Sequence, residues 1–167
     1  MLPIESLPRP SRELSQLQYH TCMNLKNFVI SNSVQLQTGN LYWDIHNSAY
    51  FEGLELIPAN DAVVMKWTVP KVENPWGCRE NKSSGMNLYF DDLKFLKMNP
   101  RDPEMPFTED ACVNSILKVD PHIEHDDPFM RTRKTWGPTE PFRLVFLFQS
   151  ARQIELESET VELIPVP

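Results

Sequence analysis

Hydrophobic residues in this chain fall in short runs, many of them alternating with polar residues, and prolines or polar turns separate the runs. The longest continuous run extends from Phe142 to Phe148, where Arg143 is the only polar residue. A short apolar run between turn-forming residues is typical of a strand that is buried on both faces. We therefore expect this segment to be a central strand of a β-sheet.

Further alternating patterns predict shorter strands. Residues 34–37 and 41–45 alternate on either side of a turn that contains Gly39, which is typical of a hairpin. Residues 62–69 also alternate, with the large apolar side chains on one face. These segments predict antiparallel strands with one face in the core.

Two pairs of neighbouring runs lie farther along the chain. Residues 86–90 and 93–98 predict a second strand pair with a bend between them. Residues 152–157 and 159–164 predict one interrupted strand or two successive strands. The apolar positions change phase near Ser158, which indicates a bulge or a turn there.

Helical patterns are found at two places. Thr108 is suited to cap a helix over 108–118, with Glu109 and Asp110 in its first turn. Residues 11–26 fit a helical face in their first half, but they also alternate as a strand does. We expect a short helix over 108–118, and we leave 11–26 open between helix and strand.

The composition changes this picture through proline. The chain of 167 residues contains fifteen prolines and only five glycines. Prolines disfavour long helices and central strand positions, so they favour short elements joined by stiff loops. We predict a mainly β fold, either a β-sandwich or a strongly curved antiparallel sheet, in a single domain over 13–167. Residues 1–12, with three prolines, are expected to form an extended arm.

Charge and cysteine content exclude some functions. The net charge of −7 opposes non-specific binding to a nucleic-acid backbone. No apolar run approaches the roughly twenty residues that a membrane-spanning helix needs. The three cysteines are odd in number and far apart, which argues against a disulfide framework. The sequence therefore favours a reducing compartment, the cytosol or the nucleus.

The loop that begins at Pro121 offers a candidate metal site. His122 and His125 are three residues apart, and Asp126 follows directly. Imidazole and carboxylate groups are ligands of zinc, manganese and iron. The alternative interpretation is an acidic, solvated loop whose histidines only titrate near neutral pH.

The second half of the same loop is basic. Arg131, Arg133, Lys134 and Trp136 form a group that could bind a phosphate, a single strand of nucleic acid or an acidic protein. The alternative is that these cations neutralise the acidic half of their own loop. A separate candidate contact is Trp76, in the long loop 70–85, because tryptophan is common among residues that dominate protein interfaces.

We predict a non-catalytic module that binds other protein chains, as one subunit of an intracellular assembly, without a cofactor. The extended arm, the two long loops and a sheet edge near residues 159–165 support this hypothesis. One alternative is an enzyme with a pocket in the sheet, lined by Tyr42, Trp43, Trp67 and Tyr89 and dependent on a divalent metal at His122 and His125. A second alternative is single-stranded nucleic-acid binding through Arg131 to Trp136.

Overall fold

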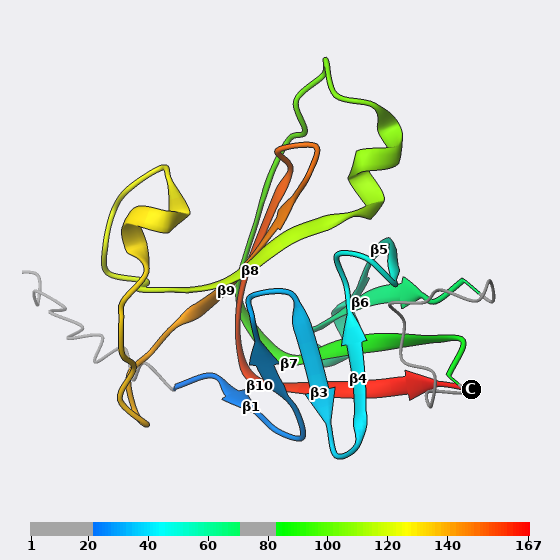
Figure 1. Cartoon of the computed structure of the whole chain (residues 1–167). Helices are drawn as coiled ribbons and strands as arrows, with labels where there is room; N and C mark the ends of the chain where they lie inside the picture. The colour runs from blue at the N-terminus through cyan, green and yellow to red at the C-terminus, as the bar shows by residue number, and fades with distance from the viewer. Residues whose placement is uncertain (1–21, 71–82) are drawn as a thin grey trace, which may run out of the picture.

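The computed structural model describes residues 22–70 and 83–167 of the chain. Two β-sheets dominate it: a strongly curled antiparallel sheet forms a half-barrel, and a small second sheet packs against it (Figure 1). The prediction of a mainly β fold with a strongly curved sheet is confirmed.

The large sheet contains seven strands in the order β5-β6-β7-β10-β9-β8, and β1 pairs in parallel with β10. Their bounds are Asn24–Leu25 (β1), Tyr50–Ile57 (β5), Ala62–Thr68 (β6), Gly85–Asn99 (β7), Val113–Val119 (β8), Arg143–Phe148 (β9) and Gln153–Val166 (β10). The small sheet contains Val29–Ser31 (β2), Gln35–Thr38 (β3) and Leu41–Asp44 (β4). The 3-10 helices of the described residues are Pro58–Asn60 (η1), Phe107–Ala111 (η2) and Pro128–Arg131 (η3).

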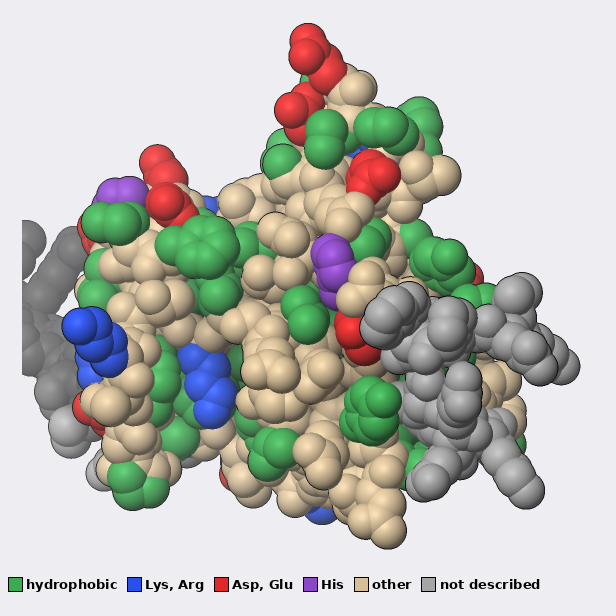
Figure 2. All heavy atoms as spheres, in the orientation of Figure 1, with side chains coloured by type: hydrophobic (Ala, Val, Ile, Leu, Met, Phe, Trp, Pro, Cys, Tyr) green, Lys and Arg blue, Asp and Glu red, His purple; other side chains and the backbone are tan. Residues whose placement is uncertain are grey.

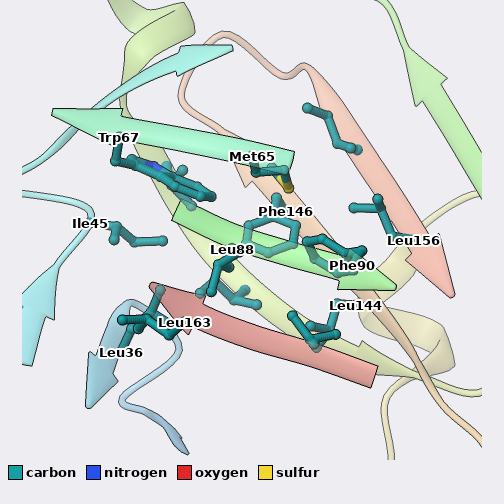
Figure 3. Packing of buried hydrophobic residues seen from close by; sticks show 14 of the residues in the cluster. Leu36, Ile45, Met65, Trp67, Leu88, Phe90, Leu144, Phe146, Leu156 and Leu163 are labelled. Carbon is teal, nitrogen blue, oxygen red and sulfur yellow. The ribbon is translucent and has the colours of Figure 1, made fainter. Parts of the chain in front are cut away.

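One hydrophobic core lies between the two sheets (Figure 3). Leu36 of β3 and Ile45 just after β4 enter this core from the small sheet, and both are fully buried. The half-barrel contributes larger side chains to it, among them Trp67, Phe90 and Phe146. Burying each such side chain favours folding by about 1.5–3 kcal/mol, so the small sheet is held to the half-barrel mainly by hydrophobic contact.

Several of the predicted strands are present. The hairpin of β3 and β4 and the strand β6 are confirmed. β9 is buried on both faces as predicted, because Phe146 faces the shared core and Val145 packs in a second cluster with Leu117 and Val119. β9 is nevertheless not the centre of the sheet: it lies one strand from the edge, and the long pair β7 and β10 occupies the middle.

The two runs predicted over 86–98 form one continuous strand, β7, instead of a strand pair. The bend at Asp92 takes the left-handed backbone conformation (φ 53°) and does not reverse the chain. The partner strand β10 shifts its register between Glu157 and Ser158, next to the predicted change of phase. Both irregularities lie together and add curvature to the sheet, as β-bulges do.

The predicted helix over 108–118 is wrong. A short 3-10 helix ends at Ala111, and Val113–Val119 is the edge strand β8 paired with β9. The β-branched residues of this segment favour a strand, and pairing with β9 satisfies its backbone along one side. Within 22–26, residues Asn24 and Leu25 form β1, so that part of the open segment is a strand and not a helix. The extended arm predicted over 1–12 and residues 13–21 lie outside the described residues.

Two projections extend from the half-barrel (Figure 1). The first comprises residues 98–112 and contains η2. We call this projection the arm from here on; it is a different segment from the extended arm predicted over 1–12. The arm is attached to the turn between β9 and β10, where the Asp102 amide donates to the Ser150 carbonyl (2.8 Å) and the Gln149 amide to the Cys112 carbonyl (3.0 Å). The second projection is the loop from Asp120 to Phe142, which contains η3.

Candidate functional site

The loop from Asp120 to Phe142 covers part of the sheet face that is turned away from the shared core. Its helix η3 begins after Asp127, whose carboxylate accepts the Phe129 amide proton (2.9 Å). Proline at the first position of η3 is compatible with this start, because its missing N–H would have no intrahelical partner. This local structure brings Arg131 from η3 onto β10.

Arg131 and Glu155 form a buried ion pair. Both terminal guanidinium nitrogens of Arg131 donate to the two carboxylate oxygens of Glu155, at 2.9 and 2.8 Å. The two residues are 8% and 6% exposed, so water is largely excluded from the pair. Bidentate pairing of this kind holds both side chains in one geometry. It fixes η3 to the middle of the large sheet.

Arg143 of β9 extends the pair into a network. Its Nε donates to Glu157 (2.8 Å) and its Nη1 to Glu155 (3.3 Å). The guanidinium carbon lies 3.7 Å from the centroid of the Phe95 ring, which is a cation–π contact. We call Arg131, Arg143, Glu155 and Glu157 the charged network.

The network controls the ionisation of its buried acid. Burial opposes the charged form of Glu155, but hydrogen bonds and the positive charges of Arg131 and Arg143 outweigh it and hold the pKa of Glu155 below its ordinary value. The hydrogen bonds from the same pair raise the pKa of Arg131. Glu155 is therefore a carboxylate at neutral pH, and it is not a proton donor for catalysis.

The other predicted binding residues of this loop also have partners inside the chain. Arg133 pairs with Asp120 and, at 3.0 Å, with Glu140. Burial works against the charge of Asp120, yet the His122 amide and Arg133 together keep the pKa of that carboxyl below its usual range.

Lys134 and Trp136 complete the predicted basic group. Trp136 is half-buried, and its ring packs against Phe142 with 5.8 Å between centroids. Lys134 is exposed, and no ion pair of its side chain is found among the described residues. Of the three predicted cations, only Lys134 remains available to a phosphate in this part of the chain.

The predicted metal ligands lie on the surface. His122, His125 and Asp126 are all exposed. The His125 Nδ1 accepts the Asp127 amide proton (3.0 Å), which occupies one of its two nitrogens. Within residues 22–70 and 83–167, no group of three or more His, Cys, Asp or Glu side chains is arranged to hold a metal ion. The donor geometry in that region therefore adds no support to the metal hypothesis.

A hollow of 630 Å³ opens beside the charged network. Its floor includes Phe95, Lys97, Arg131, Arg143 and Glu155, which belong to β7, η3, β9 and β10. The remaining lining residues come from the start of the loop: Pro121, Ile123, Glu124, His125 and Asp126. The volume lies within the range of small-ligand sites, about 300–1,000 Å³. The fold thus brings the predicted His125 and Asp126 together with Arg131, at one hollow.

Trp43 and Trp67, proposed to line a pocket under the enzyme hypothesis, are core residues. They are 2% and 1% exposed, whereas Tyr42 lies on the surface. Trp67 packs against Phe51, with ring centroids 5.2 Å apart. Trp76, the remaining predicted contact residue, lies outside the described residues.

One cysteine and one histidine meet through the fold. The Cys112 sulfur lies 3.8 Å from the His46 Nδ1, but this nitrogen lies 2.9 Å from the Val113 carbonyl and must carry a proton to bond it. It therefore cannot take a proton from the thiol. Burial raises the pKa of Cys112, and the thiol donates instead to the His46 carbonyl (3.1 Å). The pair lacks the activation that a cysteine nucleophile requires.

The arm presents an exposed aromatic residue on an ordered framework. Phe107 of η2 is 81% exposed, and its ring packs under the guanidinium of Arg101, 4.2 Å from the ring centroid. Arg101 is itself fixed by Asp110 (3.0 Å) and by the carbonyl of Met105. Figure 2 shows acidic and hydrophobic side chains together on this projection, at the top of the view.

Sequence reasoning did not single out Arg143, Glu155, Glu157 or Phe107. A signal for the network was present: Glu155 and Glu157 alternate with buried apolar residues of β10, and Arg143 is the one polar residue of its run. Charges of opposite sign on two buried strands indicate pairing across the sheet. The exposure of Phe107 was not predicted. The predicted helix begins at residue 108, so Phe107 is only the residue before it.

Comparisons of this chain with protein-family models, with curated proteins and with solved structures find no match. None of the helices in the described residues has the length and apolar character that crossing a membrane requires. The functional proposals for this chain therefore rest on the geometry of the charged network, the hollow and the arm.

Proposed function

We propose that this protein is a non-catalytic module that binds another protein chain and that the arm is its contact surface. The exposure of Phe107 on an ordered framework carries this proposal. A phenylalanine exposed by 81% offers apolar area for a partner to bury, and aromatic residues, methionine and arginine are enriched at protein interfaces. Met98 and Met105 of the same arm are 54% and 36% exposed.

The charge of the arm indicates the chemistry of the partner. Residues 98–112 contain four acidic residues and one basic residue, Arg101. Arg101 is occupied by Asp110, which leaves Asp102, Glu104 and Glu109 as the net charge of the arm. A partner surface that combines apolar side chains with lysine or arginine would complement both features.

The alternatives have weaker support. For nucleic-acid binding, Arg131 and Arg133 would have to leave internal carboxylates, and the overall charge of −7 opposes the approach. The reducing compartment that we expect, cytosol or nucleus, still rests on the cysteine count alone.

The test is affinity purification of the tagged chain from lysate of its own cells, followed by quantitative mass spectrometry. Phe107→Ala is compared with Phe129→Ala, because Phe129 is also an exposed phenylalanine (54%), on the other projection. We expect a stoichiometric partner that wild type and Phe129→Ala retain and that Phe107→Ala loses by about tenfold or more.

A second substitution checks the charge. Glu104→Lys should weaken the same complex, and raising the salt concentration should weaken the wild-type complex. If no stoichiometric partner is found, or if one is retained equally by Phe107→Ala, the arm is not the contact surface and the proposal fails.

A further inference from the structure

We propose that the hollow beside the charged network binds a short peptide with free amino and carboxyl ends. The distribution of charge in the hollow supports this inference, and it is independent of the arm. The lining residues from the sheet and η3 carry an excess of positive charge, and the lining residues from 121–126 carry negative charge. A ligand with one group of each sign and an apolar portion matches this lining.

The floor offers two cationic donors. Arg143 uses Nε and Nη1 for Glu157 and Glu155, and its Nη2 has no hydrogen-bond partner among the described residues. Stacking on Phe95 and the two carboxylates hold this guanidinium in place. Lys97 lies opposite Glu155 in the pairing of β7 with β10, and its exposed ammonium group forms no ion pair in residues 22–70 and 83–167.

The carboxylates of the floor are already neutralised. Both oxygens of Glu155 are bonded to Arg131, and Glu157 accepts from Arg143. Even when Glu157, which bonds Arg143 but does not line the hollow, is counted with Glu155, three cations, Lys97, Arg131 and Arg143, stand against two carboxylates. A ligand carboxylate can add to this set as the missing negative charge, bonded to Arg143 Nη2 and Lys97.

The lining residues from the loop have the reverse sign. Glu124 and Asp126 are exposed, and neither carboxylate has an ion-pair partner in the described part of the chain. These two acids suit a ligand ammonium group. Ile123, Pro121 and Phe95 also line the hollow and supply apolar surface to it.

The size of the hollow fits two or three residues. An extended chain spans at most about 3.3–3.6 Å per residue, so a tripeptide reaches about 10 Å between its ends. The hollow of 630 Å³ belongs to the volume class of small-ligand sites. An arginine pre-positioned by its own carboxylates loses little side-chain entropy when it binds a ligand.

The test uses a library of tripeptides Ala-Xaa-Ala with free ends, one for each middle residue. Binding to the full chain is measured by equilibrium dialysis with mass-spectrometric detection. We expect members with an apolar middle residue to bind, and acetylation of the amino end or amidation of the carboxyl end to weaken binding at least tenfold. The doubly blocked peptide Ac-Ala-Leu-Ala-NH₂ gives the background.

Two variants assign binding to the hollow. Lys97→Gln and Glu124→Gln change exposed residues, so the fold should tolerate both, and each should weaken the best peptide at least tenfold. Lys94→Gln is the matched control, because Lys94 lies on the same strand but outside the hollow and pairs with Asp92. If no library member binds above background, or if binding survives both Lys97→Gln and Glu124→Gln, the proposal is overturned.

Discussion

Arg131 and Glu155 show how strongly single residues depend on each other in this fold. Each is almost fully buried, and each would be a costly charge without the other. Exchanging a buried ion pair for apolar residues is often neutral, whereas removing one partner leaves an uncompensated charge. The pair therefore attaches η3 to the sheet, and it cannot be removed one side at a time.

We predict that Arg131→Met lowers the free energy of unfolding by about 3–5 kcal/mol, because Glu155 would be left buried and only partly bonded by Arg143. Urea unfolding of wild type and variant measures this difference. The double variant Arg131→Met with Glu155→Leu should recover most of the loss. A single variant within about 0.5 kcal/mol of wild type would show that the pair does not hold the loop.

The difference in the free energy of unfolding between wild type and Arg131→Met should depend on pH. The folded pKa of Glu155 lies below its ordinary value of 4.5, so its stabilising contribution is present above that value and is lost as the pH falls through the folded pKa. The gap in stability between wild type and Arg131→Met should therefore shrink at acidic pH. A gap that stays constant into that range would assign the loss to packing instead of charge.

At the scale of elements, the C-terminal part of β10 pairs with β7 on one side, and on its other side β1 and the side chain of Asn27 bond its backbone. Beyond β1, the Leu163 amide donates to the Asn27 side-chain oxygen (2.9 Å), and the Asn27 amide donates to the Leu163 carbonyl (2.8 Å). Pro165, two residues on, would direct its N–H to the same side but has none. The edge near residues 159–165, which we considered for a partner strand, is thus blocked by β1, Asn27 and Pro165.

We predict that Asn27→Ala lowers the free energy of unfolding by about 1–2 kcal/mol, since two backbone groups of β10 lose their partners. Asn40→Ala, in the exposed turn between β3 and β4, should stay within about 0.5 kcal/mol of wild type. Chemical denaturation of the two variants in parallel makes the comparison. Equal effects would mean that Asn27 does not close the edge.

At the scale of the whole molecule, the small sheet and the half-barrel share one core, and neither has a separate one of comparable size. Trp43 of the small sheet and Trp67 of the half-barrel belong to the same cluster. Both sheets should therefore unfold together, because the small sheet by itself would expose its apolar face to water.

We predict that Leu36→Ala, in the small sheet, lowers the stability of the entire chain by about 2–5 kcal/mol. Tryptophan fluorescence and far-ultraviolet circular dichroism should report one coincident transition, shifted equally by both probes. Two separate transitions would show that the small sheet folds independently. Val29→Ala provides the control, because Val29 lies on the same sheet but is 57% exposed.

The sequence by itself determined most of the strands. The two-residue period of β3, β4 and β6 and the apolar run of β9 are local properties, and a strand with one or two buried faces requires them. The change of phase near Ser158 was visible for the same reason, since a bulge moves later side chains to the other face.

Only the tertiary structure decided the rest. Residues 108–118 have a capping residue and a helical stripe locally, but pairing with β9 makes Val113–Val119 a strand, and that partner lies more than twenty residues away. The loop cations looked available for a ligand, but the fold places Glu155 of β10 under Arg131, and the loop folds back so that Arg133 pairs with Asp120. Charge pairing across strands depends on which strands become neighbours, and loop-closing contacts of that kind are not encoded in any local pattern.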